Sequence, residues 1–431
     1  MIVRGADVEF IREPLLAPFG FKGSHVNELW QTAVRLCSGS DAAVGVGVQS
    51  VLWSDARVFR ENSASGGNAM MFAMTNYAAR LCRGMCFSHP GELLDQLLEP
   101  VWEYGRSLTG RRDLRMTFAL NALVPLDFAA WRLYAKEQGI TSFDDLIPET
   151  ARSALCFRHG AVGEIPLVSY GMADNAIQQL LDRGNFLLKV KIGHRSAGDT
   201  DSWEMLRRDK DRLGLLHRLA ENRETPYTKS GKIAYYLDAN GMYPDCDFLK
   251  RFLDYADHIG VLPQIALLEE PLDEANTADL SGLPVRIVAD ESAHSVADVL
   301  QRIQQGYRAV ALKPAAKTLT MTFRMLEAAH RKNIPCFCAD LTAPPVTVEW
   351  SKNIASRLQP LPGILTGVLE TNGAQNYRNW SCMERYHPCA GEAFTRPQGG
   401  VFCLADMFYR CSGGVLMDSE YYCSWFAGHQ G

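Results

Sequence analysis

Five short apolar runs in the central half of the chain each end in charged residues, and this repeated feature constrains the fold more than any other. The runs FLLKVKIG, IAYYLDANG, IALLEEPL, VRIVADES and AVALKPA end around Lys191, Asp238, Glu269, Asp290 and Lys313. Their spacing suits one strand and one helix per unit, with a longer helical unit after the first run. Parallel barrels present their functional groups at strand ends in this way.

Helical patterns alternate with these runs, for example WEMLRRDKDRLGLLHRLAE and TLTMTFRMLEAAHRKN, which carry apolar residues at helical spacing. Apolar runs without polar alternation are typical of parallel strands buried on both faces. Three further runs, EIPLVSYG, IPCFCADL and ILTGVLETNG, bring the number of expected strands to eight. The pattern predicts a (β/α)8-type barrel of the α/β class over residues 161–374.

The rest of the 431-residue chain requires further structure outside the barrel. Residues 1–160 combine β-rich segments with long helical patterns, which predicts an α+β N-terminal capping domain. Residues 375–431 are rich in Cys, Tyr, Phe and Gly. A tail this apolar is expected to pack back on the capping domain and complete it.

Charge and composition narrow the class of partner. The formal net charge is −5 and no run of Lys or Arg is present, which argues against a nucleic-acid partner. The first residues lack the apolar core of a signal peptide, and no stretch is apolar enough to span a membrane. The spacing of the 12 cysteines does not suggest a disulfide framework. We therefore expect a cytoplasmic protein with reduced thiols and no membrane partner.

Three acidic residues, Asp238, Glu269 and Asp290, end consecutive expected strands. Three carboxylates at one end of a barrel repel one another unless a cation lies among them. Oxygen ligands without Cys or His point to Mg²⁺, with Mn²⁺ as a substitute. The sequence therefore predicts a metal site formed by these three carboxylates.

Two lysines flank this trio from opposite sides of the expected barrel, Lys191 on the second strand and Lys313 on the sixth. A lysine near a second lysine and a divalent cation becomes a usable base. Lys189 supplies such a neighbour for Lys191, because strand side chains repeat every second residue. The chemistry that we expect is abstraction of a proton α to a carboxylate. The metal would stabilise the enediolate, and the second lysine would deliver a proton to the other face.

The order KVK, DAN, EEP, DES, KP resembles the enolase superfamily, in its muconate-lactonizing subgroup of the mandelate racemase/muconate lactonizing enzyme family, which includes muconate cycloisomerases and dipeptide epimerases. VPLDFAAWRLYAKEQG also resembles the helix that leads into the barrel in that family. The resemblance implies that Lys191 and Lys313 are the acid/base pair and that Lys189 supports Lys191. It assigns the metal ligands to the same three carboxylates, and it implies a homo-oligomer.

The resemblance also implies that loops of the capping domain select the substrate. By position these loops include the segment PFGFKGS and the residues around Trp53. We expect Phe19 to close over the substrate and Lys22 to bind a distal carboxylate. Asn240 and Asp340, which follow strand ends, are further candidates for substrate binding.

The chain departs from its family in two places that bear on the substrate. Dipeptide epimerases use Asp-x-Asp on the eighth strand to bind a substrate ammonium, whereas this chain has Glu370-Thr371-Asn372. Glu370 remains a candidate substrate-binding residue, as a partner for an amine or for the substrate carboxylate. The His–Asp dyad of mandelate-racemase-like members is absent, since strands six and seven carry Lys313 and Asp340.

The leading hypothesis is an isomerase, a Mg²⁺-dependent racemase, epimerase or cycloisomerase that acts on a small carboxylate such as an amino-acid derivative or a dipeptide. One alternative is a lyase that performs syn-elimination, similar to o-succinylbenzoate synthases or acid-sugar dehydratases. Another is a metal-binding relative that has lost catalysis.

Overall fold

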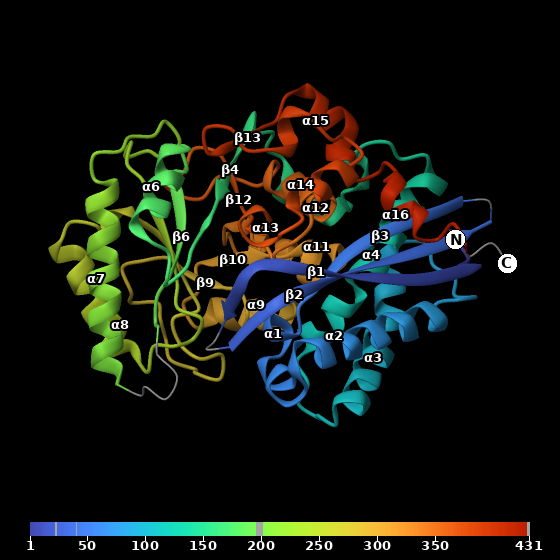
Figure 1. The fold of residues 1–431 in the computed structure, drawn as a ribbon, viewed down its shortest axis with the longest axis horizontal. Helices are drawn as coiled ribbons and strands as arrows, with labels where there is room; N and C mark the ends of the chain where they lie inside the picture. Colours follow the sequence, from blue (N-terminus) through green and yellow to red (C-terminus); the bar gives the residue numbers. More distant parts are fainter. Residues whose placement is uncertain (22–23, 40, 195–200, 429–431) are drawn as a thin grey trace.

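The computed structural model describes residues 1–21, 24–39, 41–194 and 201–428. The N-terminal part begins with a three-stranded antiparallel sheet in the order β1-β2-β3, drawn in blue in Figure 1. It continues with helices that pack on this sheet. The elements are β1 (Gly5–Phe21), β2 (Ser24–Ser38), β3 (Asp41–Gln49), α1 (Val51–Ser54), α2 (Ala56–Leu81), α3 (Pro90–Thr109), α4 (Met116–Gln138), α5 (Phe143–Leu146) and η1 (Glu149–Leu155).

Glycines on β3 let α4 approach the sheet closely. A Cβ atom on Gly45 would lie 2.1 Å from the carbonyl oxygen of Pro125, and one on Gly47 would lie 2.9 Å from the Pro125 ring. No side chain fits at such distances, so the helix backbone rests directly on the strand. The GVGV segment is therefore a packing feature of the capping domain.

All eight predicted barrel strands are present. The first is divided at Pro166 into two pieces, and the strands are β4 (Ala161–Ile165) with β5 (Leu167–Val168), β6 (Leu187–Lys191), β7 (Ala234–Asp238), β8 (Ile265–Glu269), β9 (Ile287–Ala289), β10 (Ala309–Leu312), β11 (Cys336–Cys338) and β12 (Gly367–Glu370). β4 pairs with β12 and β5 pairs with β6, both in parallel. The two halves of the first strand thus join the ends of the sheet into a barrel, which confirms the predicted fold class.

Helices follow most strands and pack on the outside of the barrel. They are α6 (Asp174–Asp182), α7 (Ser202–Ala220), α8 (Cys246–His258), η2 (Leu262–Gln264), α9 (Val296–Gln304), α10 (Pro314–Lys317), α11 (Leu319–Arg331) and α12 (Pro345–Ala355). Figure 1 shows α7 and α8 side by side along one edge of the molecule, and the two helices contact each other. α7 is the enlarged helix that the spacing predicted.

One unit differs from the expected alternation, because the connection between β8 and β9 forms no helix. Asp273, Asn276 and Asp279 each use a side-chain oxygen to accept a hydrogen bond from the backbone N–H two residues later, at 2.9 Å. These local bonds compete with helical ones, and three of them in succession keep the segment in turns. The prediction of a β/α unit here was wrong for that reason.

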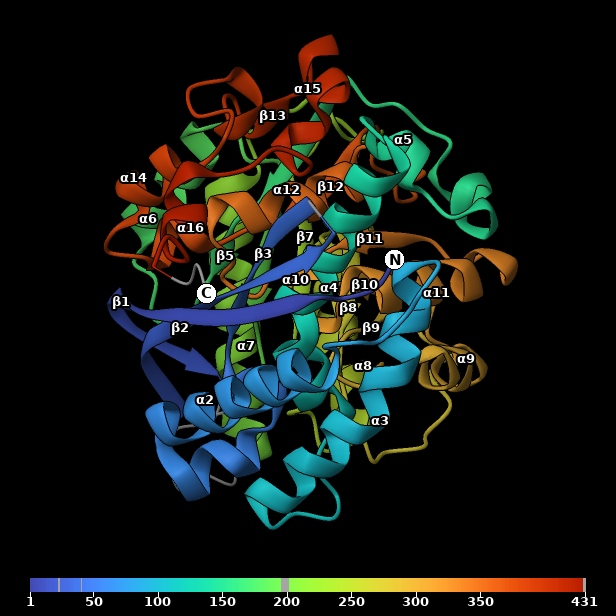
Figure 2. The same ribbon diagram turned by 90° about the vertical axis from the view of Figure 1, so that its right-hand side faces the viewer.

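The C-terminal segment packs on the N-terminal sheet, as predicted. Tyr422 and Phe426 form an apolar cluster with Ala33 and Val44, and the Tyr422 hydroxyl donates a hydrogen bond of 2.5 Å to Gln31. Figure 2 shows the C-terminal helices, in red, beside the blue strands. The elements are α13 (Gly373–Asn376), α14 (Trp380–Met383), η3 (Glu384–Tyr386), η4 (Ala393–Thr395), β13 (Val401–Cys403), α15 (Asp406–Cys411), η5 (Ser412–Gly414) and α16 (Glu420–Ser424).

A buried polar junction joins the capping domain to the barrel. Asp127 on α4 accepts hydrogen bonds from the backbone N–H groups of Leu319 and Thr320, at 2.9 and 3.2 Å, and from the Thr320 hydroxyl at 2.5 Å. Trp131, one turn further along α4, donates to the same hydroxyl at 2.9 Å. A carboxylate at the N-terminus of α11 satisfies donors that have no partner within the helix.

In the part of the chain that the structure describes, no helix is long and apolar enough to cross a membrane.

Candidate active site

The predicted charged residues lie at the same end of the barrel because neighbouring strands are in register. Lys191 is paired with Asp238 across β6 and β7, and Asp238 is paired with Glu269 across β7 and β8. A cavity lies at this end, and its volume of about 540 Å³ includes the space at its mouth that is open to solvent. Both Lys191 and Lys313 line it, from β6 and from the end of β10.

Lys189 lies at the centre of the charge network, and 3% of its side chain is exposed. Its ammonium nitrogen is 2.9 Å from Glu269 Oε1, 3.0 Å from Glu370 Oε2 and 3.2 Å from Asp238 Oδ2. It also donates to the Tyr236 hydroxyl at 3.2 Å. Burial disfavours the charged form, but the surrounding carboxylates, Glu269 first, raise the pKa of Lys189 well above its ordinary value. Lys189 therefore serves as a fixed positive charge.

Lys191 is more exposed than Lys189, with 10% of its side chain accessible against 3%. Its ammonium group donates to Asp238 Oδ2 at 2.6 Å and to the Asn240 side-chain oxygen at 2.8 Å. Burial tends to raise the pKa of Asp238, but the charges of Lys191 and Lys189 outweigh it and hold that pKa below its ordinary range. Asp238 is thus a stable carboxylate shared between two lysines.

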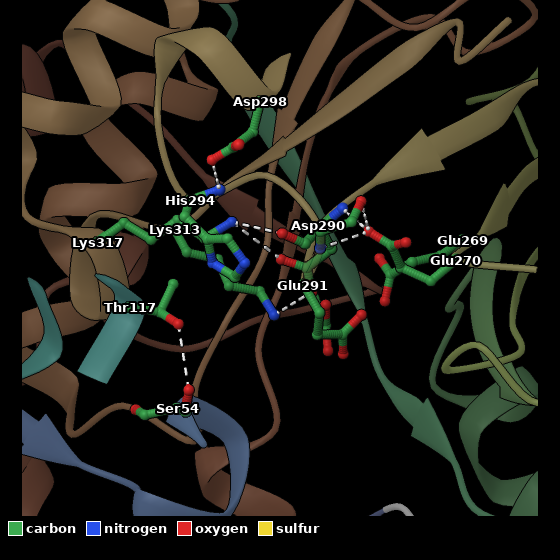
Figure 3. A network of polar contacts seen from close by, with 12 residues as sticks. Ser54, Thr117, Glu269, Glu270, Asp290, Glu291, His294, Asp298, Lys313 and Lys317 are labelled. Atoms are coloured by element: carbon green, nitrogen blue, oxygen red, sulfur yellow. Dashed lines mark hydrogen bonds and ion pairs between the residues drawn. The ribbon is translucent and has the colours of Figure 1, made fainter. Parts of the chain in front are cut away.

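Lys313 and Lys317, one helical turn apart, both contact Asp290 (Figure 3). The Lys313 ammonium group forms an ion pair with Asp290 Oδ2, and Lys317 donates to the Asp290 carbonyl oxygen at 2.7 Å. Burial disfavours the charge of Lys313, but Asp290 raises the pKa of Lys313 above its ordinary value. Burial dominates for Lys317, whose pKa is lowered. The ring of Trp53, from the capping domain, lies 4.7 Å from the Lys313 nitrogen.

Glu269, Asp290 and Glu291 form a carboxylate cluster in which one oxygen from each residue lies within 4.8 Å of the others. Burial, together with the charges of Asp290 and Glu291, raises the pKa of Glu269 to about 8. The structure thus brings together two of the three predicted ligands and adds Glu291. The third predicted ligand, Asp238, contacts the lysines of β6.

Glu270 holds the turn that carries two of these carboxylates. Its Oε1 atom accepts hydrogen bonds from the backbone N–H groups of Asp290 and Ser292, at 2.6 and 3.0 Å, and from the Ser292 hydroxyl at 2.7 Å. Glu270 has a φ of 40° and Asn240, after the neighbouring strand, has a φ of 46°. Left-handed backbone at non-glycine residues costs free energy and is concentrated at functional sites.

The donor set fits a divalent cation. Six buried carboxylates face four buried lysines, so the fully ionised cluster has two more negative than positive charges. The residues are Asp238, Glu269, Glu270, Asp290, Glu291 and Glu370, with Lys189, Lys191, Lys313 and Lys317. Excess buried negative charge is unfavourable without a cation, and oxygen ligands suit Mg²⁺.

The predicted substrate-binding residues fall into three groups. Phe19, Asp340 and Glu370 line the cavity. Asn240 instead bridges two site residues, accepting from Lys191 and donating to Glu291 at 3.1 Å. Lys22 lies outside the described residues.

Two of the cavity-lining acids are held by protein partners. Asp340 accepts three backbone hydrogen bonds, from Leu341, Ala343 and Asn372 at 2.6, 2.9 and 3.0 Å. Asp340 therefore fixes the loops after β11 and β12. Glu370 pairs with Lys189, a lysine that it shares with Glu269 and Asp238.

The capping domain covers the cavity with apolar side chains. Those that line it are Phe19, Val26, Leu29, Leu52 and Trp53. Figure 1 shows the end of β1 and the start of β2 reaching toward the barrel. The part of the cavity wall that the cap contributes is therefore formed by β1, β2 and the segment after β3.

Sequence reasoning missed Glu291, Lys317 and Tyr236. Glu291 directly follows Asp290, and two consecutive strand residues would point to opposite faces. Because β9 ends at Ala289, both acids belong to a turn and both face the cluster. Lys317 had a usable signal, its position four residues after Lys313 in a segment that begins a helix.

Comparisons with known proteins show similarity of structure only. No family model matches the chain, and no curated protein matches its sequence. A mandelate racemase/muconate lactonizing protein from Herpetosiphon aurantiacus aligns at 16% identity with a TM-score of 0.65, covering 94% of this chain and 96% of the other.

Two neighbours with named activities have the same architecture. A dipeptide epimerase from Enterococcus faecalis, complexed with Mg and the dipeptide L-Leu-L-Tyr, aligns at 12% identity and a TM-score of 0.61, covering 88% and 92% of the two chains. An N-succinyl Arg/Lys racemase from Bacillus cereus aligns at 15% identity and a TM-score of 0.61, covering 88% and 89%. At these identities the likeness establishes the fold: this chain has the fold of mandelate racemase/muconate lactonizing proteins.

Proposed function

We propose that this protein is a Mg²⁺-dependent isomerase, a racemase, epimerase or cycloisomerase that removes the proton α to a carboxylate. The observation that carries the proposal is that Lys191 and Lys313, from β6 and the end of β10, line one cavity together with Asp238 and Glu291. Two bases on separate strands around one substrate suit removal of a proton from one face and its return to the other. The activities named for the structural neighbours are of this class.

In the proposed reaction one lysine accepts the α-proton and the other donates a proton to the opposite face. Both ammonium groups pair with carboxylates in the structure, Lys191 with Asp238 and Lys313 with Asp290. A carboxylate that ligates a metal is a weaker partner for a lysine, which leaves each lysine able to exchange its proton with the substrate. Lys189 holds Asp238 and Glu269 in place and keeps its own charge.

We propose Glu269 and Asp290 as metal ligands, because both were predicted from the sequence and both belong to the carboxylate cluster of the structure. Asp238, from the predicted set, and Glu291, from the observed cluster, are the candidates for the third ligand. Mg²⁺, when bound, supplies positive charge that lowers the energy of a substrate carboxylate as its α-carbon loses a proton.

The proposed substrate is a small carboxylate with an uncharged portion against the cap wall, such as an N-acylated amino acid or a dipeptide. The apolar side chains of Phe19, Leu29 and Trp53 support this proposal. Glu370 is paired with Lys189, which makes it a weaker partner for a substrate ammonium than an unpaired acid.

The decisive experiment is deuterium uptake from D₂O by a library of dipeptides, N-acylated amino acids and hydroxy acids, followed by mass spectrometry with Mg²⁺ present. Uptake without mass loss supports the isomerase. Loss of water from a substrate would favour the lyase hypothesis instead. No deuterium uptake by any compound of the library would favour the hypothesis of a non-catalytic relative.

The two-base mechanism is tested by single substitutions. Lys191→Ala and Lys313→Ala should each lower turnover by about 10²–10⁴-fold, the usual contribution of general acid–base catalysis. Lys229→Ala, at an exposed lysine, is the matched control and should keep full activity. Full turnover in either site variant contradicts the mechanism.

The third metal ligand is identified by calorimetry of Mg²⁺ binding to Asp238→Asn and Glu291→Gln. The variant that lacks a ligand should bind at least about tenfold more weakly, a loss of about 1.4 kcal/mol. Unchanged affinity in both variants would remove both residues from the ligand set.

A further inference from the structure

Two cysteines of the C-terminal segment lie in sulfur contact, although 22 positions separate them in sequence. The Sγ atoms of Cys389 and Cys411 are 3.9 Å apart, and Met417 Sδ is 3.8 Å from the Cys389 sulfur. Cys389 follows η3 and Cys411 is the last residue of α15. Neither residue has a part in the proposed catalytic function.

The chain turns sharply after Cys411 and encloses the pair. Ser412, Gly413 and Gly414 have φ values of 54°, 59° and 81°, three successive residues in the left-handed region. A Cβ atom on Gly414 would lie 3.0 Å from the Cys389 sulfur, so glycine is needed for the turn to close over that thiol. A disulfide requires an S–S length of about 2.05 Å, so the two sulfurs must approach by about 2 Å.

Protein contacts anchor the same turn on both sides. The Ser412 hydroxyl accepts a hydrogen bond of 2.7 Å from the backbone N–H of Phe143 on α5. The Ser412 carbonyl oxygen accepts one of 2.9 Å from the Asn353 side chain on α12. The position of Cys411 is therefore set by the packing of the barrel and the capping domain.

The two thiols have different chemical characters. A hydrogen bond from Cys389, aided by the backbone N–H groups of Gly413 and Gly414, lowers the pKa of Cys411 to about 7. Donation of that hydrogen bond and burial raise the pKa of Cys389. Cys411 is partly exposed, whereas Cys389 is buried with 8% of its surface accessible. The thiolate is the reactive form, so this arrangement makes Cys411 the nucleophile and Cys389 its resolving partner.

Buried cysteines elsewhere lack this activation. Burial raises the pKa of Cys82 and of Cys336 to about 12, and it raises the pKa of Cys338 as well. Thiols of this kind are unreactive. The difference sets the pair in the C-terminal segment apart from the cysteines of the protein core.

We propose that Cys389 and Cys411 form a reversible disulfide when the protein meets a peroxide. The Cys411 thiolate attacks a peroxide oxygen, an S–O bond forms, the O–O bond breaks, and a sulfenic acid and water result. The Cys389 thiol then attacks the Cys411 sulfur, the S–S bond forms, and the S–O bond breaks with release of a second water. Two thiols are oxidised by two electrons in total, and one hydrogen peroxide is reduced to two waters. A dithiol reductant reverses the bond by exchange.

The test uses the full chain treated with hydrogen peroxide, followed by alkylation of free thiols and peptide mass spectrometry. The expected result is a cross-linked peptide that joins the segments of Cys389 and Cys411, lighter by about 2 Da than the two reduced peptides and lost on treatment with dithiothreitol. Closing the intervening loop should raise the melting temperature of the oxidised chain by roughly 3 °C.

Variants separate the two roles. Cys389→Ser should stop oxidation at the sulfenic acid of Cys411, which a dimedone probe captures, whereas Cys411→Ser should remove both the cross-link and the dimedone adduct. Cys403→Ser, at an exposed cysteine of β13, is the matched control and should oxidise like the unaltered chain. Cross-links between other cysteines, or over-oxidation of Cys411 without a cross-link, would overturn the proposal. Peptide mass spectrometry of the unaltered chain shows whether Cys389 and Cys411 become cross-linked, even if a variant fails to fold.

Discussion

Replacement of Lys189 by methionine is the sharpest test of the charge network. Methionine keeps most of the side-chain volume and removes the ammonium group that lies 2.9, 3.0 and 3.2 Å from Glu269, Glu370 and Asp238. Between 0 and 5% of each carboxylate side chain is exposed, so water cannot replace the lost cation. We expect a large loss of folding stability.

The magnitude follows from the cost of breaking a buried ion pair. Removal of one partner of such a pair costs roughly 3–5 kcal/mol, because the remaining charge stays buried without a partner. We therefore expect Lys189→Met to lower the free energy of unfolding by about 4 kcal/mol in metal-free buffer.

Urea denaturation followed by circular dichroism measures this loss. Lys352→Met is the matched control, because Lys352 is similarly buried but, among the residues that the structure describes, forms an ion pair with a single carboxylate, Glu349 at 2.6 Å. The control should lose less than Lys189→Met. A loss below about 1 kcal/mol for Lys189→Met would refute the reasoning, because it would mean that the three carboxylates do not depend on this cation.

Two further predictions concern the junctions of the capping domain. Burial raises the pKa of Asp127 to about 6 from its ordinary 3.8, so its stabilising contribution is present below about pH 4 and is lost as the pH rises through 6. Relative to Asp127→Asn, the unaltered chain should therefore lose about 3 kcal/mol of unfolding free energy between pH 4 and pH 7; parallel denaturation curves for the two proteins would contradict this. Gly45→Ala places a methyl group 2.1 Å from the Pro125 carbonyl oxygen and should destabilise the fold by about 1–3 kcal/mol. The control Gly160→Ala should have little effect, because nothing lies within 4 Å of the added methyl group. Equal melting temperatures for the two variants would argue against direct contact between helix and strand.

Much of the barrel was predictable because its signals are local. Apolar runs without polar alternation indicate buried parallel strands, and each predicted strand is present. The charged residue that closes each run was also visible, since a strand end is a feature of consecutive residues. The segment after β8 was the exception, where side chains of Asp and Asn compete with the backbone for hydrogen bonds.

The pairing of charges was beyond sequence reasoning. Lys189 was assigned a supporting role for Lys191, but its contacts with Glu269 and Glu370 depend on which strands face each other across the barrel. Glu291 faces the cluster because β9 ends one residue before Asp290, and a strand end is set by the pairing of its neighbours.

The sequence by itself determined which residue types end each strand and in what order, and from these the class of fold and a chemistry based on lysines and carboxylates. The tertiary structure alone decided which charges are neighbours, which side chains of the cap form the wall of the cavity, and that Cys389 meets Cys411. The physical reason is range. Periodicity and strand ends are set by residues near in sequence, whereas electrostatic pairing, burial and cavity shape depend on distances between atoms that folding brings together from far apart in the chain.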